Sequence, residues 1–192
     1  ETERSVRPFV RQGGAELLND KRIFRSLAAG RGIAIAAGVV AGDPRSLEAA
    51  ILSLIDLTGT VIVKQDRHSG GLGNLIVSRA GLASGLGASE VITVDNETAI
   101  AEAARMAWDR LAYLARVPLV VEVYCAVVAV VTAEFRVDGA RNAVSFLNCG
   151  EVRQAPILSG LIMPWSLSPC LAADFIAGAT EQTVHTCPTV QG

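Results

Sequence analysis

The chain has 192 residues, a formal net charge of −2 and a pI near 5.7. Hydrophobic residues make up 51% of it and aromatic residues only 5%, so its apolar mass is Ala, Val, Leu and Ile, which suits packed layers of sheet and helix. This length can bury the core of one domain or of two small ones, and the near-neutral charge excludes the basic surface that nucleic acid requires.

The first half of the chain alternates helices and strands. Residues 1–18 are predicted to be a polar lead-in segment. Asn19-Asp20 then caps a helix that ends at Gly30, and residues 32–40 alternate as a strand does. Asp43-Pro44 begins a second helix, which Gly59 ends. Its apolar face is formed by Leu47, Ala50, Ile51, Leu54 and Ile55.

Residues 60–78 (TVIVKQDRHSGGLGNLIVS) form the most informative stretch. A β-branched run ends at Lys64, a glycine-rich segment follows, and a second β-branched run returns at 75–77, which predicts strand, hairpin and strand. Neither G-x-x-x-x-G-K nor G-x-G-x-x-G is present. The hairpin amides at 69–71 and 73 are suited to an anion, with Lys64 beneath them. A mobile hairpin and a solvated lysine are the alternatives.

The second half begins with a loop at 81–89, a strand at 91–94 and a helix from Asp95 or Asn96 to Ala115, on which Trp108 is expected to pack. From 118 on, strands dominate, at 119–124, 126–137 and 143–147. The apolar stretch 117–135 is interpreted as two adjacent strands of one buried sheet. Asp138-Gly139 predicts a hairpin turn, and a last helix is expected at 170–179.

The composition also bears on membrane partners, on the cellular compartment and on self-association. The charge-free run 123–133 is too short to cross a bilayer, so no membrane partner is expected. The four cysteines (Cys125, Cys149, Cys170 and Cys187) contain no C-x-x-C pair, which favours reduced thiols and a cytoplasmic location. The high apolar content favours self-association into a homo-oligomer.

Three segments carry a resemblance to a known family: residues 19–38 (NDKRIFRSLAAGRGIAIAAG), 60–74 (TVIVKQDRHSGGLGN) and 118–124 (PLVVEVY). In this order the chain resembles the ATP-grasp superfamily of carboxylate–amine ligases, and within it the pheganomycin-type peptide ligases. The resemblance implies an α+β fold with a lead-in segment and helix (1–31), a small α/β lid subdomain (32–116) and a second, mainly antiparallel and incomplete sheet subdomain (117–192).

The resemblance also implies the site residues. Lys21 and Lys64 would contact the nucleotide phosphates, and a lid loop would close over them, formed by Ser69, Gly70, Gly71, Gly73 and Asn74. Glu122 would lie beside the adenine, with backbone hydrogen bonds from Val123 and Cys125. A carboxylate buried in VVEVY needs a partner, which a nucleotide amino group or a nearby lysine would supply. The alternative is that Glu122 faces solvent.

The implied activity is ATP-dependent formation of an amide through an acyl phosphate, with ATP and Mg²⁺ as cofactors and a small molecule or peptide supplying the carboxylate and amine. The chain departs from the family in two respects. Residues 125–128 offer no polar side chain for the ribose, and no acidic strand followed by Glu-x-Asn is present to hold Mg²⁺, so the metal ligands are unknown. A non-catalytic nucleotide-binding or interaction module, and a plain α/β scaffold, are the alternatives.

Overall fold

Two separate sheets organise the computed structural model of the chain, which describes residues 8, 10–68, 70–82, 85–112, 118–125, 130–138, 143–154 and 157–162. Among these residues, the helices are α2 (Gly14–Asn19), α3 (Lys21–Gly30), α4 (Pro44–Thr58) and α5 (Glu97–Leu111). The strands are β1 (Gly38–Ala41), β2 (Thr60–Gln65), β3 (Asn74–Ser78), β4 (Glu90–Thr93), β5 (Leu119–Val123), β6 (Val130–Asp138), β7 (Ala143–Gln154) and β8 (Leu158–Ile162).

The first sheet has five strands in the order β1-β5-β2-β3-β4. β5 lies between β1 and β2 and is antiparallel to both, whereas β4 is parallel to β3. β2 and β3 form the predicted hairpin, in which Lys64 lies directly opposite Asn74. The glycine-rich segment is therefore the connection between two central strands of this sheet.

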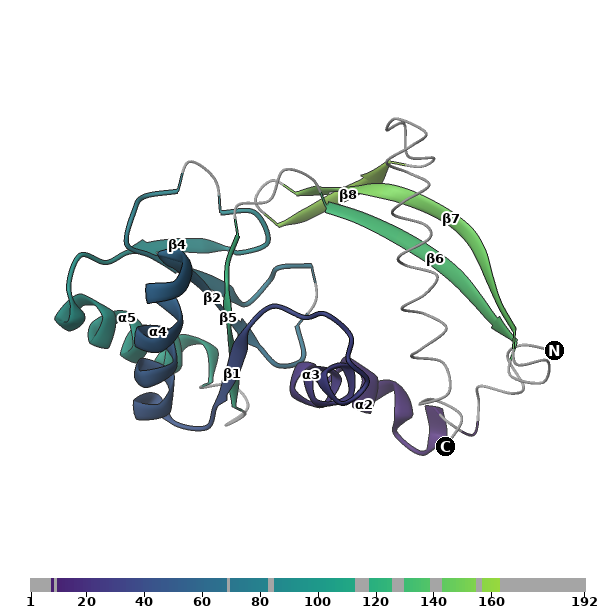
Figure 1. The fold of residues 1–192 in the computed structure, drawn as a ribbon, viewed down its shortest axis with the longest axis horizontal. Coiled ribbons are helices and arrows are strands. Elements are labelled where there is room, and N and C mark those ends of the chain that lie inside the picture. Colours follow the sequence, from purple (N-terminus) through teal and green to yellow (C-terminus); the bar gives the residue numbers. More distant parts are fainter. Residues whose placement is uncertain are drawn as a thin grey trace.

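Helices α4 and α5 cover one face of this sheet, and the second sheet lies on its other side (Figure 1). The predicted apolar face of α4 is buried in the core, together with Ile100, Ala103, Ala104, Ala107 and Leu111 of α5. Val61, Val63 and Val121 meet these helices, because alternate strand residues point to the same face. Trp108 packs at the edge of this core, as expected.

The second sheet is antiparallel, with the order β6-β7-β8. Phe135 and Phe146 meet edge to face across β6 and β7, with ring centroids 5.7 Å apart. The register between these strands shifts at Glu134/Phe135. β7 begins where the return strand was predicted, but it continues to Gln154 and pairs with β8, which the sequence did not indicate.

Three expectations from the sequence need correction. Residues 32–37 are not strand, because β5, the partner of β1, ends at Val123. The lead-in segment contains helix α2. The stretch 117–135 does not form two adjacent strands, because β5 is central in the first sheet and β6 opens the second. An apolar run indicates burial but does not identify the partner strand.

The sheets therefore divide between Val123 and Val130, after position 118, from which strands were predicted to dominate. Ser69, Gly139 of the predicted turn and the expected last helix at 170–179 lie outside the described residues. Among those that the structure describes, no helix is both long and apolar enough to cross a membrane.

Candidate functional site

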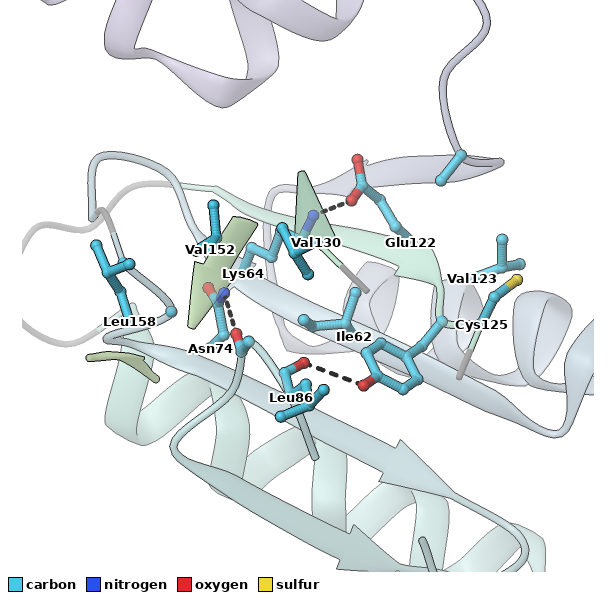
Figure 2. A pocket seen from close by; sticks show the side chains of 15 residues that line it. Ile62, Lys64, Asn74, Leu86, Glu122, Val123, Cys125, Val130, Val152 and Leu158 are labelled. Atoms are coloured by element: carbon cyan, nitrogen blue, oxygen red, sulfur yellow. Dashed lines mark hydrogen bonds and ion pairs between the residues drawn. The ribbon is translucent and has the colours of Figure 1, made fainter. Parts of the chain in front are cut away.

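A cavity of about 410 Å³ lies between the two sheets. β2, β3, β5 and the glycine-rich hairpin form one side of it, and Val130, Val152 and Leu158 of the second sheet contribute to the other (Figure 2). The first sheet brings the polar and charged groups, together with apolar Ile62 and Val123, whereas the lining residues of the second sheet are all aliphatic. The cavity therefore has a polar wall opposite an apolar one.

The polar wall follows from strand alternation. Lys64 on β2 lies opposite Asn74 on β3, and Glu122 on β5 lies opposite Ile62 on β2, so these four side chains share the face that α4 and α5 leave uncovered. Tyr124, two residues after Glu122, points to the same face and donates from its hydroxyl to the carbonyl of Leu86 at 3.0 Å. Burial raises the pKa of Tyr124.

A charge cluster surrounds the carboxylate of Glu122. Lys64 Nζ donates to Oε2, and Arg25 Nη1 donates to Oε1, so each carboxylate oxygen has its own cation. The side chains of Glu122 and Arg25 are each 13% exposed and that of Lys64 is 27% exposed. Arg25 also donates from Nη2 to the carbonyl of Ala36 at 3.0 Å. Glu122 is thus paired and largely buried, not solvent-facing.

Lys21 lies at the beginning of α3, next to the hairpin. Its Nζ donates to the carbonyl oxygens of Asp66, at 2.9 Å, and His68, at 2.5 Å. Burial lowers the pKa of Lys21, and the nearby charge of Lys64 acts in the same direction. Lys21 and Lys64 are the only lysines among the 192 residues, and both lie at this end of the first sheet.

The glycine-rich hairpin folds against two neighbours. Gly71 has φ +85°, and a Cβ there would lie 2.9 Å from the carbonyl oxygen of Gly87. The carbonyl of Gly70 accepts a hydrogen bond from Leu158 N of β8 at 2.9 Å, which connects the hairpin to the second sheet. Asn74 donates from Nδ2 to the Gly87 carbonyl at 2.7 Å. Its buried Oδ1 has no hydrogen-bond partner among the described residues.

The structure brings most of the predicted site residues together. The cavity is lined by Lys64, Gly70, Gly71, Asn74, Glu122, Val123 and Cys125. Lys21 and Gly73 are in the surrounding structure but do not line it, and Ser69 lies outside the described residues. The amide of Val123 donates to the carbonyl of Ala37, so a ligand contact of Val123 would have to use its carbonyl.

Sequence reasoning missed Tyr124, which lines the cavity, and Arg25, which pairs with the lining residue Glu122. Arg25 follows Lys21 by four positions, a spacing that places both side chains on one face of a helix. Tyr124 follows Glu122 by two positions in a strand, which has the same consequence. Both signals were present in the sequence. They become informative only once Lys21 is known to lie beside the hairpin and Glu122 to line the cavity.

The described residues show no preformed metal site made of side chains alone. They contain no group of three or more His, Cys, Asp or Glu side chains placed to hold a metal ion. Glu134 of β6 accepts a hydrogen bond from Asn148 Nδ2 at 2.8 Å. The carboxylate nearest the cavity, Glu122, is already shared between two cations.

No protein family model and no curated protein sequence matches the chain. Solved structures do match. N5-carboxyaminoimidazole synthetase from Staphylococcus aureus, in complex with ADP, has 19% identity and a TM-score of 0.61 over 88% of this chain and 37% of its own. The biotin carboxylase domain of Hydrogenobacter thermophilus 2-oxoglutarate carboxylase, with MgADP and bicarbonate, has 17% identity and a TM-score of 0.64 over 91% and 34%.

D-alanyl-alanine synthetase A from Vibrio cholerae has 15% identity and a TM-score of 0.55 over 90% of this chain and 48% of its own. The chain thus spans less than half the length of each of these structures. At such identities the similarity concerns the fold. The chain has an α+β, ATP-grasp-like fold, with a small α/β subdomain and a mainly antiparallel sheet subdomain.

Proposed function

We propose that the chain is part of an ATP-dependent carboxylate–amine ligase and that ATP binds in the cavity between the two sheets. The observation that carries the proposal is this cavity, in which a glycine-rich hairpin and a half-buried lysine meet a strand bearing a paired carboxylate. Similar folds in structures with ADP and MgADP support it. The apolar wall suits the purine, and Lys64 on the polar wall suits the phosphates.

In this proposal Lys64 contacts the phosphates, and the hairpin that includes Ser69, Gly70, Gly71, Gly73 and Asn74 closes over them. Lys21 contributes positive charge from the edge of the site. Glu122, Val123 and Cys125 lie beside the adenine. Preorganised donors of this kind stabilise the charge that develops during phosphoryl transfer, and a closed hairpin excludes water.

The proposed reaction has two steps. The γ-phosphoryl group of ATP passes to a carboxylate of the substrate, which gives an acyl phosphate and ADP. An amine then attacks the acyl carbon, phosphate leaves and the amine loses a proton, so that an amide is formed. We further propose a small-molecule or peptide substrate, a peptide-type bond as in pheganomycin-type ligases, and a cytoplasmic location. The predicted subdomain bounds, 32–116 and 117–192, and self-association also remain proposals.

A second candidate is a non-catalytic nucleotide-binding module. It is favoured because the described residues contain no group of three or more His, Cys, Asp or Glu side chains that could hold a metal ion. The two candidates differ in one product. If hydroxylamine is added to the protein with MgATP and a panel of carboxylic acids, a ligase converts its acyl phosphate to a hydroxamate. A binding module binds ATP and yields no hydroxamate with any acid.

The replacement Lys64→Ala tests the nucleotide site itself. A ligand at about 100 times its Kd stabilises the native state by about 2.7 kcal/mol. We expect MgATP to raise the Tm of the wild-type protein and to leave the Tm of Lys64→Ala unchanged. Arg79→Ala is the control, because Arg79 pairs with Asp56 in an exposed ion pair. If Lys64→Ala is stabilised like the wild-type protein, the assignment of Lys64 is wrong.

A further inference from the structure

Arg25 and Lys64 share a single carboxylate. Each cation occupies one oxygen of Glu122, and the three side chains are mostly buried. The pair on the Lys64 side is an obstacle to any anion that needs Lys64, because the ammonium must turn away from Glu122 to reach it. A mostly buried carboxylate that loses its only counter-ion is strongly destabilising. The second cation determines how costly that movement is.

The fold holds Arg25 at this carboxylate by two hydrogen bonds and leaves room for it beside a glycine. Its guanidinium donates to Ala36 as well as to Glu122, which fixes the planar fork at two points. Gly38 of β1 lies opposite Glu122. A Cβ at Gly38 would lie 2.8 Å from Cγ of Glu122 and 2.9 Å from Nη2 of Arg25. The edge strand thus has no side chain at the position over which the guanidinium passes.

We propose that Arg25 is a positioning residue that keeps Glu122 paired and so releases Lys64 for an anionic ligand. Lys64 alternates between Glu122 and the ligand, whereas Arg25 stays on the carboxylate throughout. Without Arg25, Glu122 would depend on Lys64 alone and would retain it. The competition between the two cations is a property of the protein itself. Its consequence for ATP rests on the proposed function.

The competition can be measured without a nucleotide, because the chain has only two lysines. Sulfo-NHS-acetate acylates lysine amines, and peptide mass spectrometry gives the ratio of Lys64 to Lys21 modification. We expect Arg25→Gln to lower this ratio several-fold, since Glu122 then holds Lys64 more firmly. Glu122→Gln should raise it, and Arg25→Gln should have no effect in that background. An unchanged ratio in Arg25→Gln overturns the proposal.

A double-mutant cycle then extends the test to ATP. By calorimetry with MgATP, we expect Arg25→Gln to weaken binding about tenfold and Arg25→Lys to recover part of the loss. In Glu122→Gln the further change Arg25→Gln should alter affinity by less than about twofold. Arg79→Gln, in the exposed pair with Asp56, is the matched control and should bind as the wild type does.

The outcomes separate the two proposals. An equal loss in both backgrounds means that Arg25 contacts the nucleotide directly, and no loss in either means that it has no positioning role. Both results overturn the inference. If the wild-type protein does not bind MgATP, the proposed function fails, and the acylation ratio alone decides whether Arg25 controls the release of Lys64.

Discussion

Glu122 is the residue at which the charges of the cavity meet. As the only carboxylate in an apolar strand, it was expected to need a partner, either a nucleotide amino group or a nearby lysine. The lysine is Lys64 on the neighbouring strand β2, two residues beyond Ile62, which lies directly opposite Glu122. Arg25 is a second partner, from a helix 97 positions away in sequence. Strand chemistry predicts that a counter-ion is needed, but only the fold determines which residue provides it.

At Gly71 the structure explains why the hairpin is rich in glycine. Its backbone is left-handed, and a Cβ would lie 2.9 Å from the backbone oxygen of Gly87. We expect Gly71→Ala to lower the free energy of unfolding by about 1–3 kcal/mol, from strain and from the displaced loop. Chemical denaturation measures this loss.

The matched control for that change is Gly32→Ala. Gly32 has φ +70°, but a Cβ there would have no neighbouring atom within 4 Å, so it has the left-handed strain without the close approach. The difference between the two variants therefore measures the contact between the hairpin and Gly87. Equal losses would mean that the hairpin does not depend on this contact.

At the scale of elements, Arg22 at the N-terminus of α3 pairs with two buried carboxylates, one in the helix cap and one at the start of the hairpin. Asp20 accepts hydrogen bonds from the amides of Arg22 and Ile23, as the predicted cap requires. Asp66, which directly follows β2, accepts from the Arg22 amide at 3.3 Å, and its Oδ2 lies 3.2 Å from Arg22 Nε. Both carboxylates are almost completely buried. Arg22 thus fixes the helix that carries Lys21 and Arg25 to the strand that carries Lys64.

This attachment depends on pH. The hydrogen bond from the Arg22 side chain lowers the pKa of Asp20 from 3.8 to about 2, against the opposing effect of burial. A lowered pKa stabilises the protein above the unfolded-state value, and this contribution is lost as pH falls from about 4 to 2. We expect a loss of up to about 2 kcal/mol, reduced by solvent around the partly exposed Arg22.

Asp20→Asn isolates this contribution, because Asn caps helices as well as Asp does but does not titrate in this range. Urea unfolding of both proteins between pH 2 and 5 gives the difference in free energy of unfolding. The wild-type advantage should be present at pH 5 and shrink toward pH 2. A difference that stays constant over this range would mean that Asp20 has the same pKa in the folded and unfolded states.

The elements differ in how far they could be predicted. α4 has Asp43-Pro44 at one end, Gly59 at the other and one apolar face between them, and each local signal agrees with the structure. The predicted strand at 32–40 begins six residues before β1, since the alternation in sequence extends past the last residue of its partner β5. The extent of a strand depends on its neighbours, and these lie about 80 positions away in sequence.

At the scale of the whole molecule, the cavity arises because two sheets with different surfaces face each other. Lys64, Asn74 and Glu122 could be selected from sequence because their segments had a recognisable order. The opposite wall could not, because Val130, Val152 and Leu158 are ordinary aliphatic residues of strands with no motif. β8 itself was not predicted, and the strand is known only through its pairing with β7.

The hydrogen bond from Leu158 N to the Gly70 carbonyl is the direct connection between the hairpin and the second sheet. If ATP binds between the sheets, closure of the hairpin should protect the amides on both sides of this contact. We therefore expect MgATP to slow amide hydrogen exchange at Leu158 and at Gln65, whose amide donates to the Gly73 carbonyl.

The amide of Val94 is the internal reference, since it donates to Ser78 at the opposite end of the first sheet and should exchange at the same rate with and without the nucleotide. Slowing at Gln65 without slowing at Leu158 would mean that the hairpin responds to ATP independently of the second sheet. The cavity would then not close as one unit, and the aliphatic wall would have no part in holding the nucleotide. Slowing at both positions would make the two sheets the two halves of a single binding site.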